Sequence, residues 1–239
     1  MKKNVKRLYR KSLAVLALFS LELALVTLIF SVSLYIFYLV WRYVIFQGEE
    51  LEGYTVFDKR VFEWIESWSG PGMTTFMEIV TVLANRNFII AASVILILYF
   101  LFIRKHKWFS MKIPVVALGC ITLNIILKEM IGRARPTMPL IEAFGLSFPS
   151  GHAMMAFSFY GLLIYISYRS ISNKILRYLT CIFLFILIHL IALSRVYLRV
   201  HFATDVVAGL ALGAAWLFLS LFVLVKVEKF SGRKIEPVL

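Results

Sequence analysis

Three short segments of this 239-residue chain combine cationic, hydroxyl, imidazole and carboxylate side chains. They are KEMIGRARP (residues 128–136), PSGH (149–152) and SRVYLRVHFATD (194–205). Cations suit the oxygen atoms of a phosphate, and a histidine supplies either a nucleophilic nitrogen or a proton. The residue types therefore indicate chemistry on an anionic, phosphate-like group.

Three cations in these segments are candidates for holding such a group. Lys128 and Arg135 lie seven residues apart, so they share one helix face if the helix continues to Pro136. Proline disfavours helix in the residue before it, which makes Arg135 close to the last helical residue. Arg195 arrives from another segment. The three form a candidate anion clamp, because arginine binds phosphate oxygens in pairs and lysine adds a point charge.

The quartet PSGH is typical of a helix start. Unpaired backbone N–H groups and a partial positive charge at a helix start attract phosphate. We expect Ser150 to cap the helix, Gly151 to let a ligand approach the backbone, and His152 to project into the same space. On its own, such a quartet is equally explained by an ordinary capped helix with a solvated histidine.

His201 and Asp205 are four residues apart, and therefore on one face if this stretch is helical. A carboxylate that accepts a hydrogen bond from one imidazole nitrogen fixes the tautomer and leaves the other nitrogen free to attack. For an isolated pair with this spacing, an ion pair at a helix start is the commoner explanation. The presence of Arg195 in the same segment favours the catalytic interpretation.

The other ionisable residues nearby have simpler interpretations. We interpret Arg133 and Arg199 as interfacial side chains whose charged ends reach water. His189 lies inside an apolar run, and we expect it to form a hydrogen bond between helices. Glu129 and Glu142 are isolated, so the sequence offers no carboxylate cluster for Mg²⁺, and we expect neither a metal nor a cofactor.

The composition is that of an integral membrane protein. Hydrophobic residues make up 61% of the chain and charged residues 16%, against about 45–50% and roughly 25% in soluble domains. The net charge of +13 would suggest a nucleic-acid partner in a soluble protein, but most cations here flank apolar runs, so none is expected. Cys120 and Cys181 lie in apolar runs and are interpreted as small hydrophobic residues, not a disulfide.

Apolar runs predict an all-α protein with six transmembrane helices, since about 20 apolar residues cross the bilayer. The predicted spans are 23–43, 87–104, 113–132, 152–169, 175–194 and 205–226. Residues 1–239 are treated as one membrane-embedded domain with a basic N-terminal segment (1–22) and a tail (227–239). Residues 5–22 lie along the interface or extend a tilted first helix.

The longest polar stretch, residues 47–86, separates the first two spans. Apolar residues recur at helical spacing on both sides of a Gly-Pro-Gly break at 70–72. They are Phe57, Val61, Trp64, Ile65 and Trp68 before the break, and Phe76, Ile79, Val80 and Leu83 after it. We therefore predict two short amphipathic helices at the membrane surface.

The distribution of Lys and Arg predicts the orientation of the chain. Four stretches, 1–12, 104–112, 169–177 and 226–234, hold 17 of the 26 Lys and Arg residues. Positive charge in short loops marks the cytoplasmic side. Both termini are therefore expected in the cytoplasm, and the three chemically active segments at the extracytoplasmic face.

Taken in order, the segments K-x6-R-P, P-S-G-H and S-R-x5-H-x3-D resemble the motifs of the type 2 phosphatidic acid phosphatase superfamily, and no motif residue departs from the pattern. The six-span layout fits its membrane branch. The resemblance implies that His201 is the nucleophile that forms a phosphohistidine, that Asp205 orients it and that His152 is the general acid. The phosphoryl oxygens would be held by Lys128, Arg135, Arg195, Ser150 and the backbone of Gly151.

The resemblance also implies a substrate: a phosphorylated lipid of a bacterial cytoplasmic membrane. Candidates are undecaprenyl diphosphate, phosphatidylglycerophosphate, phosphatidate and the phosphate groups of lipid A, and the short chain is most similar to the undecaprenyl-diphosphate and phosphatidylglycerophosphate group. A phosphotransferase with the same histidine chemistry remains an alternative, because nothing in the motifs identifies the acceptor. A non-catalytic transporter or structural protein is a third. The soluble vanadium haloperoxidases share the motif pattern but are disfavoured by the apolar composition.

Overall fold

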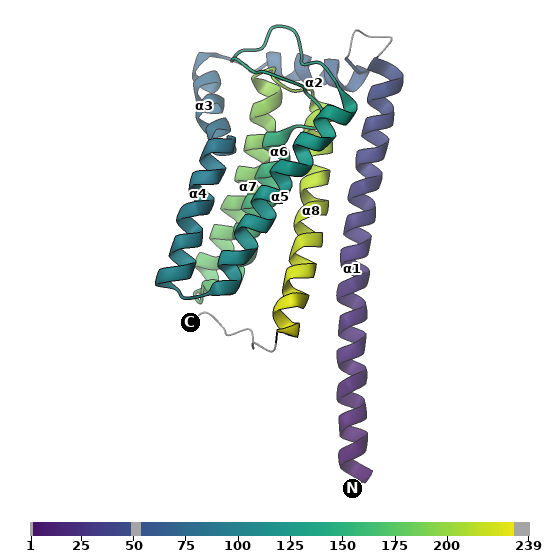
Figure 1. Ribbon diagram of the computed structural model, residues 1–239. Helices are drawn as coiled ribbons and strands as arrows, with labels where there is room; N and C mark the ends of the chain where they lie inside the picture. The colour runs from purple at the N-terminus through teal and green to yellow at the C-terminus, as the bar shows by residue number, and fades with distance from the viewer. Residues whose placement is uncertain (1, 49–53, 232–239) are drawn as a thin grey trace.

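The computed structural model describes residues 2–48 and 54–231, with side chains described for 21–46 and 54–231, and these residues contain helices but no strand. In chain order the elements are α1 (Lys2–Gly48), α2 (Val56–Glu66), α3 (Pro71–Val82), α4 (Arg86–Leu98), the π-helix η1 (Tyr99–Ile103), α5 (Lys107–Ile131), α6 (Gly151–Ser170), α7 (Lys174–Tyr197) and α8 (Ala203–Phe230). The long helices run side by side, and α2 lies across one end of the bundle (Figure 1). The all-α prediction is confirmed for this part of the chain.

Five segments of the described chain are long and apolar enough to cross a membrane: Leu21–Phe46, Arg86–Ile103, Lys107–Ile131, Lys174–Tyr197 and Ala203–Phe230. Each overlaps one of the predicted spans. The remaining predicted span, 152–169, corresponds to α6, which is not one of the five. α6 packs against α5, α7 and α8, and a helix covered by other helices exposes less surface to lipid. The six-span count therefore stays a prediction.

The first helix includes residues 5–22, whose location along the interface or in a tilted span stays a prediction. α1 is continuous from Lys2 to Gly48, so this segment is helical and joins the first span without a break. α1 packs along α8 and reaches beyond the other helices at the end away from α2 (Figure 1). At that same end α8 continues to Phe230, past the predicted boundary at 226.

Both short helices predicted between the first two spans are present, as α2 and α3. α2 begins with a reciprocal capping box: the Thr55 hydroxyl accepts from the N–H of Asp58, and the Asp58 carboxylate accepts from the N–H of Thr55. The predicted apolar faces are only partly correct, because Ile65 and Val80 are buried against the bundle whereas Ile79 is exposed. The membrane-surface location of both helices stays a prediction.

Two glycines bring α8 into close contact with α6. A Cβ atom on Gly209 would lie 2.5 Å from the Ser150 carbonyl oxygen, and one on Gly213 would lie 2.6 Å from that of Met154. The two glycines form a Gly-x-x-x-Gly pattern, which lets membrane helices approach backbone to backbone. At the start of both helices the N–H of Ser150 donates to the carbonyl oxygen of Asp205 at 3.0 Å. The first turns of α6 and α8 therefore lie directly beside each other.

The two cysteines are free thiols, which confirms that they form no disulfide with each other. Cys120 is buried in α5, and Cys181 is half-buried in α7. Cys120 packs with Met154, Met155 and Leu212 as a small apolar residue.

Candidate active site

The three segments meet at the end of the bundle where α2 lies, and they surround a cavity of about 550 Å³. Six of the predicted site residues line it: Lys128, Arg135, Gly151, His152, Arg195 and His201. The other two, Ser150 and Asp205, are fully buried. The volume lies within the range of about 300–1,000 Å³ typical of small-molecule sites. The fold therefore assembles the predicted constellation in one place.

His201 lies between α7 and α8 and is 1% exposed. Its Nδ1 is 3.3 Å from Oδ2 of Asp205, and its Nε2 is 3.3 Å from Nη1 of Arg135. A proton on Nδ1 shared with the carboxylate leaves the lone pair on Nε2. Burial of the ring, together with the positive charges of Arg195, Arg135 and Lys128, lowers the pKa of His201 well below its ordinary value of 6.5. The imidazole is therefore neutral at pH 7, the form that can attack phosphorus.

The pairing of His201 with Asp205 has a different local cause from the one expected. His201 precedes α8, so the two residues do not share a helical turn. Asp205 instead occupies the third position of α8, where its Oδ2 accepts from the N–H of Phe202 at 2.9 Å. The hydroxyl of Ser147, in the loop before α6, also donates to this oxygen and lies 3.4 Å from Nδ1 of His201. A helix-start carboxylate thus holds the imidazole.

The shared helix face predicted for Lys128 and Arg135 is wrong. α5 ends at Ile131, and Gly132 follows in the left-handed conformation with φ 73°, the usual helix stop. Lys128 remains in the last turn, where its Nζ donates to the Leu146 carbonyl at 2.5 Å. Arg135 lies in the loop beyond. The prediction failed because the glycine stops the helix before the proline can.

Arg135 still reaches the cavity because it joins two loops. Its Nη1 donates to the Val200 carbonyl at 2.7 Å, next to His201, while Nη2 and Nε donate to the carbonyls of Phe144 and Gly145, both at 3.0 Å. These bonds hold the loop between α5 and α6 against the turn between α7 and α8. Both segments contribute to the cavity wall.

Arg195 projects from the last turn of α7 and is 5% exposed. Its Nη1 donates to Oγ1 of Thr81, on α3, at 2.5 Å. Its Nε is buried and has no hydrogen-bond partner among the residues that the structure describes. Buried polar groups are nearly always paired. A guanidinium of this kind in a cavity wall is suited to an anionic ligand.

The start of α6 differs in two ways from the expectation. Ser150 is the N-cap residue, but its side chain makes no capping hydrogen bond, and its hydroxyl is buried without a partner in the described part of the chain. At Gly151 an added Cβ atom would lie 2.7 Å from Oδ1 of Asn124, so a larger residue there would displace that side chain. His152, in the first turn, is half-buried and lines the cavity. A role of these residues in binding phosphate stays a prediction.

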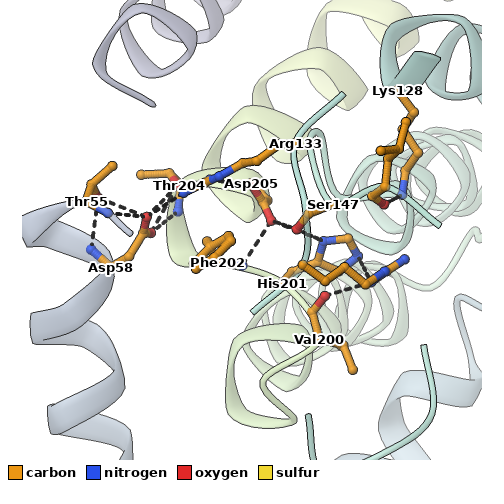
Figure 2. A network of polar contacts seen from close by, with 12 residues as sticks. Thr55, Asp58, Lys128, Arg133, Ser147, Val200, His201, Phe202, Thr204 and Asp205 are labelled. Atoms are coloured by element: carbon orange, nitrogen blue, oxygen red, sulfur yellow. Dashed lines mark hydrogen bonds and ion pairs between the residues drawn. The ribbon is translucent and has the colours of Figure 1, made fainter. Parts of the chain in front are cut away.

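Arg133 is the principal correction to the expectations from sequence, because it is buried and does not reach water. Its Nη1 donates to Oδ1 of Asp205 at 2.6 Å, and its Nη2 to Oδ2 of Asp58 at 3.0 Å. The guanidinium also lies 3.9 Å from the centroid of the Phe202 ring. Figure 2 shows this network running from α2 to His201. Arg133, Asp58 and Ser147 were not identified as site residues from the sequence. The Thr-x-x-Asp pattern at 55–58 would have predicted a helix start there, but not the contact of Asp58 with Arg133.

The remaining ionisable residues are placed as follows. Arg199 is half-exposed and donates to Glu66 at 3.3 Å on the surface. His189 is exposed on α7 and donates to the Phe185 carbonyl of its own helix at 2.9 Å. Among the residues whose side chains are described, it makes no hydrogen bond to another helix, contrary to the expectation. Glu129 lines the cavity. Within the described residues, no group of three or more His, Cys, Asp or Glu side chains is arranged to hold a metal ion.

Comparison with known proteins places the chain in a family. The model of the PAP2 superfamily matches residues 109–228. Phosphatidylglycerophosphatase B of Bacillus subtilis (strain 168) is 31% identical over 193 residues, which cover 79% of this chain and 91% of that protein. Lipid phosphate phosphatase delta of Arabidopsis thaliana is 28% identical over 151 residues, covering 56% of this chain and 35% of that protein.

Solved structures give the same result. The crystal structure of a transmembrane PAP2-type phosphatidylglycerolphosphate phosphatase from Bacillus subtilis matches with a TM-score of 0.75 and 27% identity, covering 84% of this chain and 98% of that one. LpxE of Aquifex aeolicus shares the fold, with a TM-score of 0.57 and 23% identity over 72% of this chain and 98% of that one. The chain therefore belongs to the PAP2 superfamily of type 2 phosphatidic acid phosphatases, in its membrane-embedded branch.

Proposed function

We propose that this protein hydrolyses the terminal phosphate of phosphatidylglycerophosphate, or of a related phosphorylated membrane lipid, through a phosphohistidine on His201. The observation that carries the proposal is the cavity in which His201 and His152 share a lining with Lys128, Arg135 and Arg195. The similarity to phosphatidylglycerophosphatase B of Bacillus subtilis supports the choice of lipid.

In the proposed reaction, His201 is the nucleophile and His152 transfers the protons. Nε2 of His201 attacks the phosphorus, the bond from phosphorus to the lipid oxygen breaks, and His152 gives that oxygen a proton. His152 then takes a proton from a water molecule, whose oxygen attacks the phosphohistidine and releases inorganic phosphate. Lys128, Arg135 and Arg195 neutralise the charge that develops on the phosphoryl oxygens, and such electrostatic stabilisation often accounts for most of an enzyme's rate enhancement.

We place the reaction at the extracytoplasmic face of a bacterial cytoplasmic membrane. The start of α1 and the end of α8 lie at the end of the bundle opposite to the cavity (Figure 1). The excess of Lys and Arg in the stretches near that end supports a cytoplasmic location for both termini. A lipid headgroup could then enter the cavity while its tails stay in the bilayer.

Phosphate release by the purified protein in detergent tests the proposal. The assay contains EDTA and compares phosphatidylglycerophosphate, undecaprenyl diphosphate, phosphatidate and lipid A. We expect release to persist in EDTA, because the histidine mechanism uses no metal ion, and to be fastest with phosphatidylglycerophosphate. Loss of activity in EDTA that returns with added Mg²⁺ would contradict the mechanism, and a faster rate with another lipid would change the assigned substrate.

Arg86 offers a prediction about substrate choice. It begins α4 on the cavity wall, between Asn85 and Asn87. A lipid with a second phosphate beyond the scissile one can place that phosphate against Arg86, whereas phosphatidate has none. We expect Arg86→Gln to lower kcat/KM for phosphatidylglycerophosphate about tenfold, equivalent to about 1.4 kcal/mol, and to change the value for phosphatidate much less.

The matched control is Arg60→Gln, which removes an exposed arginine from α2, outside the cavity lining. This variant should leave both rates unchanged. An equal loss with both lipids in Arg86→Gln would show that Arg86 does not select for a second phosphate.

A further inference from the structure

Three buried charges of alternating sign link α2 to the imidazole of His201 (Figure 2). Asp58 and Asp205 are both 0% exposed, and Arg133 between them is 9% exposed. Arg133 donates to Asp58 with Nη2 and to Asp205 with Nη1, at 3.0 and 2.6 Å. Asp58 comes from outside the three motifs, and Arg133 has no catalytic role in the sequence-based expectations. Both lie at the back of the site, away from the cavity lining.

We propose that Asp58 and Arg133 are positioning residues for the nucleophile: they hold the Asp205 carboxylate in the plane that orients His201. The inference rests on the proposed function, since it assigns His201 as the attacking group.

The contacts of Asp205 show how its orientation is determined. Oδ1 accepts from Arg133, while Oδ2 accepts from the Phe202 N–H at 2.9 Å, from the Ser147 hydroxyl and, at 3.3 Å, from His201. With both oxygens engaged, the carboxylate cannot rotate. Loss of Arg133 would free Oδ1 and leave two buried carboxylates without a shared cation, a costly arrangement.

Asp58 determines in turn where Arg133 lies. Its Oδ2 accepts from Arg133, and its Oδ1 accepts from the backbone N–H of Thr204 at 2.9 Å. Thr204 directly precedes Asp205 in the first turn of α8, so Asp58 also satisfies a free N–H group at that helix start. The Thr55 capping box fixes Asp58 itself. A chain of charge-assisted hydrogen bonds thus connects α2 to the nucleophile.

The three charges also set how readily the His201–Asp205 pair takes up a proton. The charged or titratable groups that face His201 are Asp205, Arg135, Arg195, Lys128 and His152. Arg133 lies behind Asp205, and Asp58 lies behind Arg133. Removing the cation should raise the pH at which the pair protonates, and removing the distal anion should lower it, whichever atom of the pair carries the proton.

The test compares Arg133→Gln, Arg133→Lys and Asp58→Asn with wild type. Hydrolysis of dioctanoyl phosphatidate in detergent micelles is measured as kcat, KM and the pH profile of kcat/KM. We expect kcat to fall about 10- to 100-fold in Arg133→Gln and Asp58→Asn, with KM within about twofold of wild type because the phosphate-facing cations are untouched. Arg133→Lys should recover part of kcat.

The pH profile separates positioning from mere loss of folded protein, because its midpoint does not depend on the active fraction. The acidic limb should move up by about one pH unit in Arg133→Gln, move down in Asp58→Asn, and stay near wild type in Arg133→Lys. If Arg133→Gln does not fold, the inference is tested by the acidic limb and kcat of Asp58→Asn and by the partial recovery of kcat in Arg133→Lys.

The surface pair Glu66–Arg199 supplies matched controls, since it joins α2 to the same turn before α8 with an ion pair of 3.3 Å. Glu66→Gln and Arg199→Gln should leave kcat and the acidic limb unchanged. An unmoved acidic limb and a wild-type kcat in Asp58→Asn, with the same result in Arg133→Gln where that variant folds, would overturn the inference. Phosphate release by the wild type would in that case leave the proposed function standing. No release by wild type would instead mean that the proposed function has failed.

Discussion

Replacing His201 with alanine is expected to lower phosphate release from phosphatidylglycerophosphate by about four orders of magnitude or more, as for other covalent nucleophiles. His201 lines the cation-lined cavity, where its Nδ1 is paired with Asp205 and its Nε2 lies 3.3 Å from Nη1 of Arg135. Brief reaction with a substrate labelled in its terminal phosphate should trap an acid-labile, base-stable phosphoprotein in the wild type. The variant should form none.

His189→Ala is the matched control, because this histidine is exposed on α7 and bonds only to its own helix among the contacts described. It should retain wild-type activity and labelling. Labelling that persists in His201→Ala would show that another residue is the nucleophile. Binding of orthovanadate, a phosphate analogue, by the inactive variant would show that the cavity itself is intact.

Replacing Gly209 with alanine is expected to lower activity about 100-fold and to reduce thermal stability. The added Cβ would lie 2.5 Å from the Ser150 carbonyl oxygen and 3.1 Å from Cβ of Ala153, so α6 must move away from α8. Overpacking of this kind costs about 1–3 kcal/mol. The same movement separates His152, on α6, from His201, just before α8, and a misplacement of about 1 Å can cost about 100-fold in rate.

Gly72→Ala is the control for this prediction, since no atom lies within 4 Å of a Cβ built there. It should leave the activity and the melting temperature of the detergent-solubilised protein near wild type. Gly209→Ala with normal kcat and an unchanged melting temperature would show that the crossing of α6 and α8 does not position the two histidines.

The sequence by itself determined the helices and motifs that depend only on residues close together in the chain. Continuous apolar runs are sufficient to place α1, α5, α7 and α8, since a span of this length must satisfy its backbone hydrogen bonds internally as helix. The residue types and spacings of the three motifs are equally local. They named six residues that the structure brings to one cavity.

Two predictions failed because a nearby residue, itself visible in the sequence, determined the local structure instead. Gly132 ends α5 in the left-handed conformation, before Pro136 can have an effect. Asp205 is a helix-start carboxylate, and its bond to the Phe202 N–H fixes it beside His201 without any shared helical turn. Both errors concern where a helix begins or ends, which depends on backbone geometry at a single residue.

The tertiary structure decided which charges become buried and paired. Arg133 and Arg199 look alike in the sequence, yet one joins Asp58 and Asp205 in the interior and the other joins Glu66 at the surface. Asp58 is 75 residues from Arg133 along the chain, so no periodicity connects them. Arg133 can be buried because the fold places carboxylates beside it. Those of Asp58 and Asp205 are brought close by the packing of α2, α8 and the loop after α5.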